Sequence, residues 1–218
     1  MIKAVIFDMD GVLIDTEKWL QQYWRQAAAE AGFDMTKEHT LSIRSLAGKY
    51  AAPYLQGIFG EKFSYWDIRE RRKELMKEHI AQHGIEKKPG VDEVLDYLRA
   101  HGIRTAVATA TDPIRAKEYL TKIGIYDKFD EVVCATMVEN GKPKPDVYLY
   151  ACKQIGENPK DCIAVEDSPN GVRSAVDAGI RTVMVPDLAK PDEETAKIIT
   201  AEANTLFDLI SMLEDGIL

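Results

Sequence analysis

Long apolar runs, paired cysteines and an excess of positive charge are all missing from this sequence. No apolar run approaches the ~20 residues that span a bilayer, and the start of the chain lacks the charged, apolar and cleavage segments of a signal peptide. We therefore expect a cytoplasmic protein without a membrane partner. The cysteines include no Cys-x-x-Cys pair and lie far apart in apolar stretches, which excludes a disulfide framework and indicates buried, reduced residues: Cys134, Cys152 and Cys162.

Basic residues are also in the minority. Lys and Arg number 28 against 36 Asp and Glu, so the formal net charge is -8. Nucleic acids and anionic membrane surfaces are bound through faces rich in Lys and Arg, so this balance excludes both as broad partners. Any anion must be bound locally, which favours a small-molecule partner.

The composition that is present is typical of a folded globular protein, with 45% hydrophobic and 29% charged residues. A length of 218 residues is sufficient for one core domain with a smaller insert. A monomer is the expected state of such a chain.

Short apolar runs alternate with helical patterns over most of the chain, which predicts an α/β fold with a doubly wound parallel sheet. The runs are expected to be strands buried on both faces, at 3–7, 105–108, 131–134, 162–165 and 182–185. The helical patterns cover 91–100, 113–123, 146–155 and 171–178.

This alternation stops between residues 16 and 85, where only helical patterns occur: 17–31, 40–59 and 65–83. We call residues 16–85 the helical insert and expect it to be a second, smaller α-helical cap domain over the carboxyl edge of the sheet. The core domain would then comprise 1–15 and 86–218. Tryptophans and tyrosines gather in the insert, and packing of a small helical core explains them better than substrate stacking.

The first predicted strand ends in Asp8-Met9-Asp10-Gly11. Two carboxylates at i and i+2 of an extended segment can point to the same side, at the sheet edge where ligands of such folds bind. Gly11 permits a turn and leaves room for a phosphate or a metal ion. Taken alone, the pair is equally consistent with an acidic turn at a strand end.

Three later loops favour a functional site. Thr109, followed by Ala110, Thr111 and Asp112, places a hydroxyl and free amides at a helix N-terminus, although Thr111 and Asp112 also suit simple capping. Lys142 lies in a proline-rich loop that can aim one lysine rigidly. Glu166 and Asp167 form a second acidic pair that can offer oxygen ligands to a hard cation.

Together these motifs resemble the haloacid dehalogenase-like hydrolase superfamily, in particular its branch of β-phosphoglucomutase-like enzymes and sugar-phosphate phosphatases. The resemblance covers nearly the whole chain and rests on residues 8–17, Thr109, 142–146 and 166–171. It implies a Rossmann-like core with an α-helical cap, which agrees with the position of the helical insert.

The resemblance implies a Mg²⁺-dependent phosphatase that hydrolyses a small phosphorylated metabolite, such as a sugar phosphate. Asp8 would attack phosphorus and form an aspartyl-phosphate, while Asp10 would protonate the leaving oxygen and later activate water. Asp10 also argues for phosphate rather than halide chemistry, because the dehalogenase branch lacks a second aspartate there.

Positive charge is required because a carboxylate must approach a phosphate dianion, and such a contact costs on the order of 4 kcal/mol at ~4 Å and an effective dielectric of 20. The resemblance assigns Mg²⁺ to Asp8, Asp167 and the Asp10 carbonyl, with Glu166 either a further ligand or a partner of Lys142. The phosphate oxygens would be bound by Lys142, by Thr109 and by the amides of Met9, Asp10 and Ala110.

A β-phosphoglucomutase-like phosphohexomutase is the main alternative. Such mutases have a cap histidine and a cap arginine that grip a second phosphate, whereas the corresponding positions here hold Leu20 and Ala51. This departure favours a hydrolase. Lys49 is a candidate for a cap-side anion contact, with Arg71 and Lys73 more typical of a solvated helix face.

Two non-enzymatic alternatives carry less weight. A phospho-acceptor receiver has its acidic pair before a separate acceptor aspartate on a later strand and has no helical cap. A degenerate member of the superfamily with a binding or regulatory role would usually lack Asp8, Asp10 or Lys142, all of which are present. The scattered histidines show no metal-ligand spacing.

Overall fold

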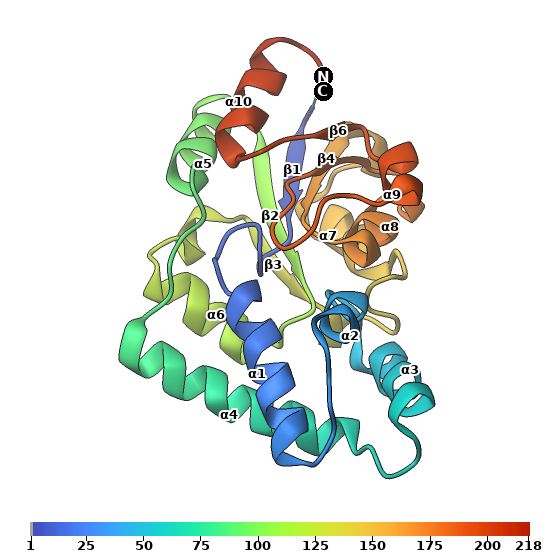
Figure 1. Ribbon diagram of the computed structural model, residues 1–218. Helices are drawn as coiled ribbons and strands as arrows, with labels where there is room; N and C mark the ends of the chain where they lie inside the picture. The colour runs from blue at the N-terminus through green and yellow to red at the C-terminus, as the bar shows by residue number, and fades with distance from the viewer. Residues whose placement is uncertain (1) are drawn as a thin grey trace.

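A parallel six-stranded sheet forms the centre of the computed structural model, which describes residues 2–218 (Figure 1). The strand order is β3-β2-β1-β4-β5-β6, so the first strand lies in the middle with β2 and β4 as its neighbours. The strands are β1 Ala4–Phe7, β2 Arg104–Thr109, β3 Glu131–Cys134, β4 Cys162–Glu166, β5 Arg181–Met184 and β6 Ala201–Glu202.

Helices cover both faces of the sheet because side chains alternate along each strand. Val5 and Phe7 pack in the hydrophobic cluster that contains α5, α6 and α10, whereas Ala4 and Ile6 pack in the cluster that contains α7 and α8. The helices are α5 Val91–Ala100, α6 Pro113–Lys122, α7 Asp146–Ile155, α8 Pro169–Asp177, α9 Glu193–Ile198 and α10 Leu206–Glu214. Short 3-10 turns occur at Tyr126–Lys128, Ala135–Met137 and Pro159–Asp161.

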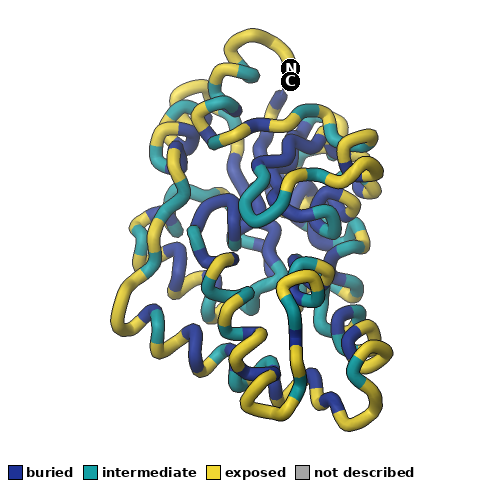
Figure 2. Tube along the Cα trace, viewed as in Figure 1, coloured by how far each residue is buried: buried dark blue, intermediate teal, exposed yellow. Residues whose placement is uncertain are grey.

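The helical insert contains the remaining helices and lies at one end of the molecule (Figure 1): α1 Glu17–Glu30, α2 Lys37–Ser42, α3 Gly48–Phe59 and α4 Tyr65–His83. It has a hydrophobic cluster of its own, built around side chains such as Trp24, Leu55 and Phe63. Met76 and Ile80, near the end of α4, pack instead in the large cluster of the sheet. Figure 2 shows buried positions along the sheet and alternating buried and exposed positions along α1 and α4.

The predicted doubly wound sheet is confirmed, and α4, α5 and α7 have the predicted bounds. The single helix predicted over 40–59 is wrong, because the chain leaves the helix between α2 and α3, where Ser45 has a φ of 57°. The short strand β6 and helices α9 and α10 were not predicted. The three cysteines are free and buried, as expected.

The loops at the carboxyl ends of β1 and β4 meet where the strand order reverses, which is the usual ligand position of such sheets. The helical insert contacts the start of α8, after β4, and the loop after β3 through its own main-chain atoms. Asn170 donates to the Arg44 carbonyl at 2.9 Å, and the Ala47 amide donates to the Lys142 carbonyl at 2.9 Å. Over residues 2–218, no helix combines the length and the apolar character that a membrane crossing requires.

Candidate active site

A buried lysine links the carboxyl ends of β1 and β4. Lys142 Nζ donates to Asp8 Oδ1 and to Glu166 Oε1, both at 2.6 Å, and none of the three side chains has appreciable exposure. The Tyr148 hydroxyl donates to the same Glu166 oxygen at 2.6 Å. Glu166 is therefore a hydrogen-bond partner of Lys142, the second of the two roles left open by the sequence.

Burial and charge act in opposite directions on this trio. Burial raises the pKa of Asp8 to about 7, although Lys142 counteracts part of that effect. Burial alone would lower the pKa of Lys142, but the carboxylates of Asp8 and Glu166 outweigh it and raise that pKa. Lys142 is therefore a permanent cation beside Asp8.

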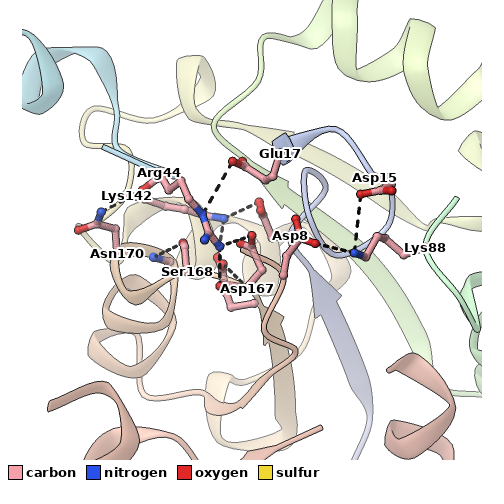
Figure 3. Close-up of polar contacts among 12 residues, drawn as sticks. Asp8, Asp15, Glu17, Arg44, Lys88, Lys142, Asp167, Ser168 and Asn170 are labelled. Carbon is pink, nitrogen blue, oxygen red and sulfur yellow. Dashed lines mark hydrogen bonds and ion pairs between the residues drawn. The ribbon is translucent and has the colours of Figure 1, made fainter. Parts of the chain in front are cut away.

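A second cation reaches the site from the helical insert. Arg44 Nη2 donates to Asp167 Oδ2 at 2.5 Å and to the Asp167 carbonyl at 2.6 Å, and Arg44 Nε lies 3.8 Å from Glu17 Oε2 (Figure 3). Burial raises the pKa of Asp167 well above its ordinary value and that of Glu17 to about 8, against the opposing effect of Arg44. Arg44 therefore favours the charged form of both carboxylates, against the effect of burial.

Three buried carboxylates could hold a metal ion. Asp8, Glu166 and Asp167 each offer an oxygen, and these oxygens lie within 4.8 Å of one another. Asp167 Oδ1 is buried without a hydrogen-bond partner, so it has a free acceptor. A set of hard carboxylate oxygens fits a hard divalent cation such as Mg²⁺. The Asp10 carboxylate does not belong to this acidic cluster.

Two glycines leave room for the acidic cluster. A Cβ at Gly171 would overlap the Glu166 carboxylate, and a Cβ at Gly11 would overlap Asp167 Oδ2. Gly11 also has a φ of +85°, which disfavours other residues. Close approach of backbone to carboxylate therefore requires glycine at both positions.

Two hydroxyl groups fix the Asp10 carboxylate, which lies outside the acidic cluster. Thr16 Oγ1 donates to Asp10 Oδ1 at 2.6 Å, and Thr111 Oγ1 donates to Asp10 Oδ2 at 2.9 Å. Thr111 therefore does not cap α6. Asp112 does, because its carboxylate accepts from the Arg115 amide at 3.1 Å.

The loop after β2 completes the core side of the site. The Thr109 side chain is buried at the end of the strand, and its Oγ1 accepts from the Thr111 amide at 3.0 Å. Thr109 and Ala110 line a cavity of about 90 Å³ together with Asp8 and Asp10. The structure thus brings most of the predicted site residues together.

Two predicted residues have other surroundings. Lys49 is exposed and donates to the Glu139 carbonyl at 3.1 Å and to Asn140, so the structure does not bring its amine to the cavity. The Met9 side chain is fully buried in the core, and its carbonyl accepts from the amides of Leu13 and Ile14. Only the Met9 main chain is available to the site.

Sequence reasoning missed the residues that the helical insert contributes to the cavity. Helical patterns indicate which positions are apolar, but they do not show which polar side chains meet the core. Glu17 belongs to the first motif and Leu20 is the counterpart of the mutase histidine, whereas no sequence signal marks the polar residues Gln21, Arg44, Arg69 and Arg72. The cavity-lining residues of the insert include Glu17, Leu20, Gln21, Trp24, Arg44, Tyr65, Arg69 and Arg72.

Comparisons with known proteins agree with this geometry. Residues 5–185 match the model of the haloacid dehalogenase-like hydrolases. A phosphorylated carbohydrates phosphatase of Thermotoga maritima is 32% identical over 182 residues, which are 84% of this chain and 84% of that relative.

Two solved structures have the same fold over nearly their whole length. The structure of CbbY from Rhodobacter sphaeroides in complex with phosphate has a TM-score of 0.79 and 28% identity, and the match covers 96% of both chains. The β-phosphoglucomutase of Clostridium difficile has a TM-score of 0.84 and 25% identity, covering 100% of this chain and 97% of the other. These matches confirm the predicted superfamily, fold and enzyme class, a phosphatase of this superfamily.

Proposed function

This chain belongs to the haloacid dehalogenase-like hydrolase family, and we propose that it is a Mg²⁺-dependent phosphatase of a small phosphorylated metabolite, with Asp8 as its covalent nucleophile. The observation that carries this proposal is the buried contact of Lys142 Nζ with Asp8 Oδ1 at 2.6 Å. A lysine in that position orients the carboxylate and offsets the repulsion of a phosphate dianion.

In the proposed reaction, an Asp8 oxygen attacks phosphorus in line, and the bond from phosphorus to the ester oxygen breaks. Asp10 gives its proton to the leaving oxygen and then takes a proton from the water that hydrolyses the aspartyl-phosphate. The hydroxyls of Thr16 and Thr111 hold the Asp10 carboxyl in one orientation. Lys142, Thr109 and the amides of Met9, Asp10 and Ala110 bind the phosphoryl oxygens.

We assign the metal site to Asp8 and Asp167, with Glu166 close to it and the Asp10 carbonyl as a further ligand. The unpartnered Asp167 Oδ1 supports this assignment. When bound, Mg²⁺ supplies positive charge to the phosphoryl group and to the attacking carboxylate. Glu166 contributes chiefly by fixing Lys142.

The helical insert serves in this proposal as a cap domain, comprising residues 16–85, over a core of 1–15 and 86–218. A cavity of about 90 Å³ is small beside the ~300–1,000 Å³ of drug-sized ligand sites, which favours a small substrate. A sugar phosphate is consistent with the name of the Thermotoga relative. A cytoplasmic monomer stays a prediction.

A phosphohexomutase is the second candidate, supported by the likeness to β-phosphoglucomutase. Two positions in the insert favour hydrolysis over mutase activity. Leu20 lines the cavity with an apolar side chain, and Ala51 is buried within the hydrophobic cluster of the insert. Neither can grip a second phosphate.

The test is phosphate release from a panel of sugar phosphates, nucleotides and small phosphate esters with Mg²⁺, for the wild type and for Asp8→Asn, with analysis for isomerised sugar phosphate. Release that is lost in Asp8→Asn and on metal chelation supports the phosphatase. An isomerised hexose phosphate without release assigns the mutase. Full activity of Asp8→Asn would refute the proposed nucleophile.

A further inference from the structure

Two side-chain contacts join helix α7 to strand β4. The Cys152 thiol donates to Cys162 Sγ at 3.8 Å. The Tyr148 hydroxyl donates to Glu166 Oε1 at 2.6 Å. Cys152 follows Tyr148 by four residues on the helix, and the two strand partners are also four residues apart. Positions with this spacing share one face of a helix and one face of a strand, so the same two faces meet at both contacts.

The cysteine pair lies at the amino end of β4, away from the active site. Cys162 is the first residue of the strand, and its thiol donates to the Asn158 carbonyl at 3.2 Å. The residues Cys152 and Cys162 are 2% and 0% exposed, but Asn158 is exposed in the loop that connects α7 to β4. A single loop therefore covers the sulfur atoms, and local opening of such a loop admits a small oxidant.

The third cysteine belongs to a different part of the core. Cys134 ends β3 and packs in the hydrophobic cluster on the opposite face of the sheet from the pair. Burial raises the pKa of the Cys134 thiol to about 11, which disfavours the reactive thiolate. The hydrogen bond from Cys152 instead lowers the pKa of the Cys162 thiol, although burial acts against it. Cys162 is therefore the sulfur that reacts first with an oxidant.

The chain thus contains two thiols in contact, one of which favours the thiolate. Disulfides outside oxidising compartments are usually transient and redox-sensing. We propose that Cys152 and Cys162 form a reversible redox pair, which a peroxide joins in a disulfide and a dithiol reduces, and that the disulfide lowers enzyme activity. The disulfide itself is independent of the proposed function, whereas its effect on activity rests on that function.

Hydrogen peroxide oxidises the pair in two steps. The Cys162 sulfur attacks one peroxide oxygen, the O–O bond breaks, and the departing hydroxide takes the thiol proton, which gives a sulfenic acid and water. The Cys152 sulfur then attacks the sulfenic sulfur, the S–O bond breaks, and the departing hydroxide takes the second thiol proton. The two thiols lose two electrons in total, and the products are one disulfide and two molecules of water.

The disulfide acts on the active site through Tyr148. Sulfur atoms that lie 3.8 Å apart as thiols come to about 2 Å in a disulfide, so α7 must shift against β4. The Tyr148 hydroxyl and Lys142 Nζ share one oxygen of Glu166, and Lys142 also contacts Asp8. A shift of α7 therefore alters the contact that fixes Glu166 and, through it, the lysine beside Asp8. Misplacement by about 1 Å in such a site lowers activity by up to about 100-fold.

The test is treatment of the reduced protein with hydrogen peroxide, followed by thiol counting and tryptic peptide mapping without a reductant. Lys153 and Lys160 lie between the two cysteines, so trypsin separates them into different peptides. The wild type should lose two thiols and yield one linked pair of peptides, containing Cys152 and Cys162. Dithiothreitol should restore both thiols. Three thiols after treatment, or a link that includes Cys134, would overturn the proposal.

Two variants separate the steps of the reaction. Cys152→Ala blocks the second step, so dimedone should label Cys162 in this variant after peroxide treatment. Cys134→Ala is the matched control, because it removes a buried thiol from the other face of the sheet and should still form the linked pair. Dimedone on Cys134 rather than on Cys162 would overturn the proposed reaction.

Hydrolysis of p-nitrophenyl phosphate by the reduced protein tests the proposed function separately. Peroxide should lower kcat by about tenfold or more in the wild type and in Cys134→Ala, and dithiothreitol should reverse the fall. Cys152→Ala should keep its kcat. Tyr148→Phe should lose most of the sensitivity to peroxide, because the hydroxyl that transmits the shift is absent.

Full activity of the disulfide form, or an equal fall in Cys152→Ala, would overturn the effect on the active site. If no ester is hydrolysed, the proposed function fails, and the peptide map still decides for or against the redox pair.

Discussion

Arg44 Nη2 lies 2.5 Å from Asp167 Oδ2, so a side chain of the helical insert neutralises a carboxylate of the acidic cluster. Asn170, in the first turn of α8, holds the same segment through the Arg44 carbonyl. A divalent cation bound to Asp167 would repel the guanidinium and compete for this oxygen. We therefore expect metal binding at Asp167 to be coupled to the position of the α2–α3 segment.

Replacing Arg44 by methionine should strengthen Mg²⁺ binding and lower the unfolding free energy of the metal-free protein. Loss of a buried positive charge near the acidic cluster predicts an affinity gain of at least about tenfold. It also leaves Asp167 and Glu17 buried without their cation, which costs about 3 kcal/mol of unfolding free energy. Calorimetric Mg²⁺ titration and denaturant unfolding, with and without Mg²⁺, measure both effects.

The control for this variant is Arg99→Met on α5, where the arginine is exposed. Neither Mg²⁺ affinity nor stability should change in the control. Weaker Mg²⁺ binding by Arg44→Met would contradict the competition between guanidinium and metal.

Lys142→Met should abolish activity and destabilise the protein by about 3–5 kcal/mol, because two buried carboxylates lose their shared cation. Denaturant unfolding and phosphate release measure these losses. Lys144→Met, two residues away and exposed, should behave like the wild type in both assays. Retention of activity by Lys142→Met would remove the main support for the proposed function.

Gly171→Ala should reduce activity strongly, because the added methyl group overlaps the Glu166 carboxylate that fixes Lys142. Gly57→Ala is a matched control within α3, where an added Cβ meets nothing within 4 Å, and it should stabilise the protein by about 0.5–1 kcal/mol. Steady-state kinetics and thermal unfolding test the pair. Equal activity of both variants would mean that the position of Glu166 does not matter.

Replacing Asp112 by asparagine should lower the free energy of unfolding by an amount that depends on pH. Burial raises the Asp112 pKa, but hydrogen bonds from the Arg115 side chain and amide lower it overall. A depressed pKa in the folded state stabilises the protein above the ordinary value near 3.9, and this contribution disappears as the pH falls through the folded pKa. The difference from the wild type should be about 0.5–1 kcal/mol between pH 5 and 7 and should vanish at lower pH.

Denaturant unfolding across that pH range checks this expectation, with Asp34→Asn, an exposed aspartate, as the control. A difference that grows as the pH falls would contradict the sign.

Much of the core could be predicted because its signals are local. Strands buried on both faces give continuous apolar runs, and the loops that follow them carry the polar residues, as with Asp8 after β1. The break between α2 and α3 could not be predicted, since residues 40–59 retain a helical pattern and the turn at Ser45 depends on tertiary contacts. The two-residue strand β6 carries too little pattern to be recognised.

The active site was predictable on the core side and unpredictable on the side of the insert. Asp8, Lys142 and Asp167 follow strands, where the topology fixes the edge at which they meet. Arg44 lies in the turn after α2, where no sequence pattern marks it, and Arg72 lies on α4, where only packing against the core distinguishes it from its neighbour Arg71. The charge of Lys49 makes it a candidate in the sequence, but its amine contacts Glu139 and Asn140 rather than the cavity.

The most direct test of the central claim is acid quenching of the enzyme during turnover of a phosphate ester, followed by peptide mass mapping. The account predicts one added phosphoryl group on Asp8, more of it in Asp10→Asn, where the proton donor and base is lost, and none in Asp8→Asn. A phosphoryl group on any other residue, or turnover without a phosphorylated Asp8 in either the wild type or Asp10→Asn, would contradict it.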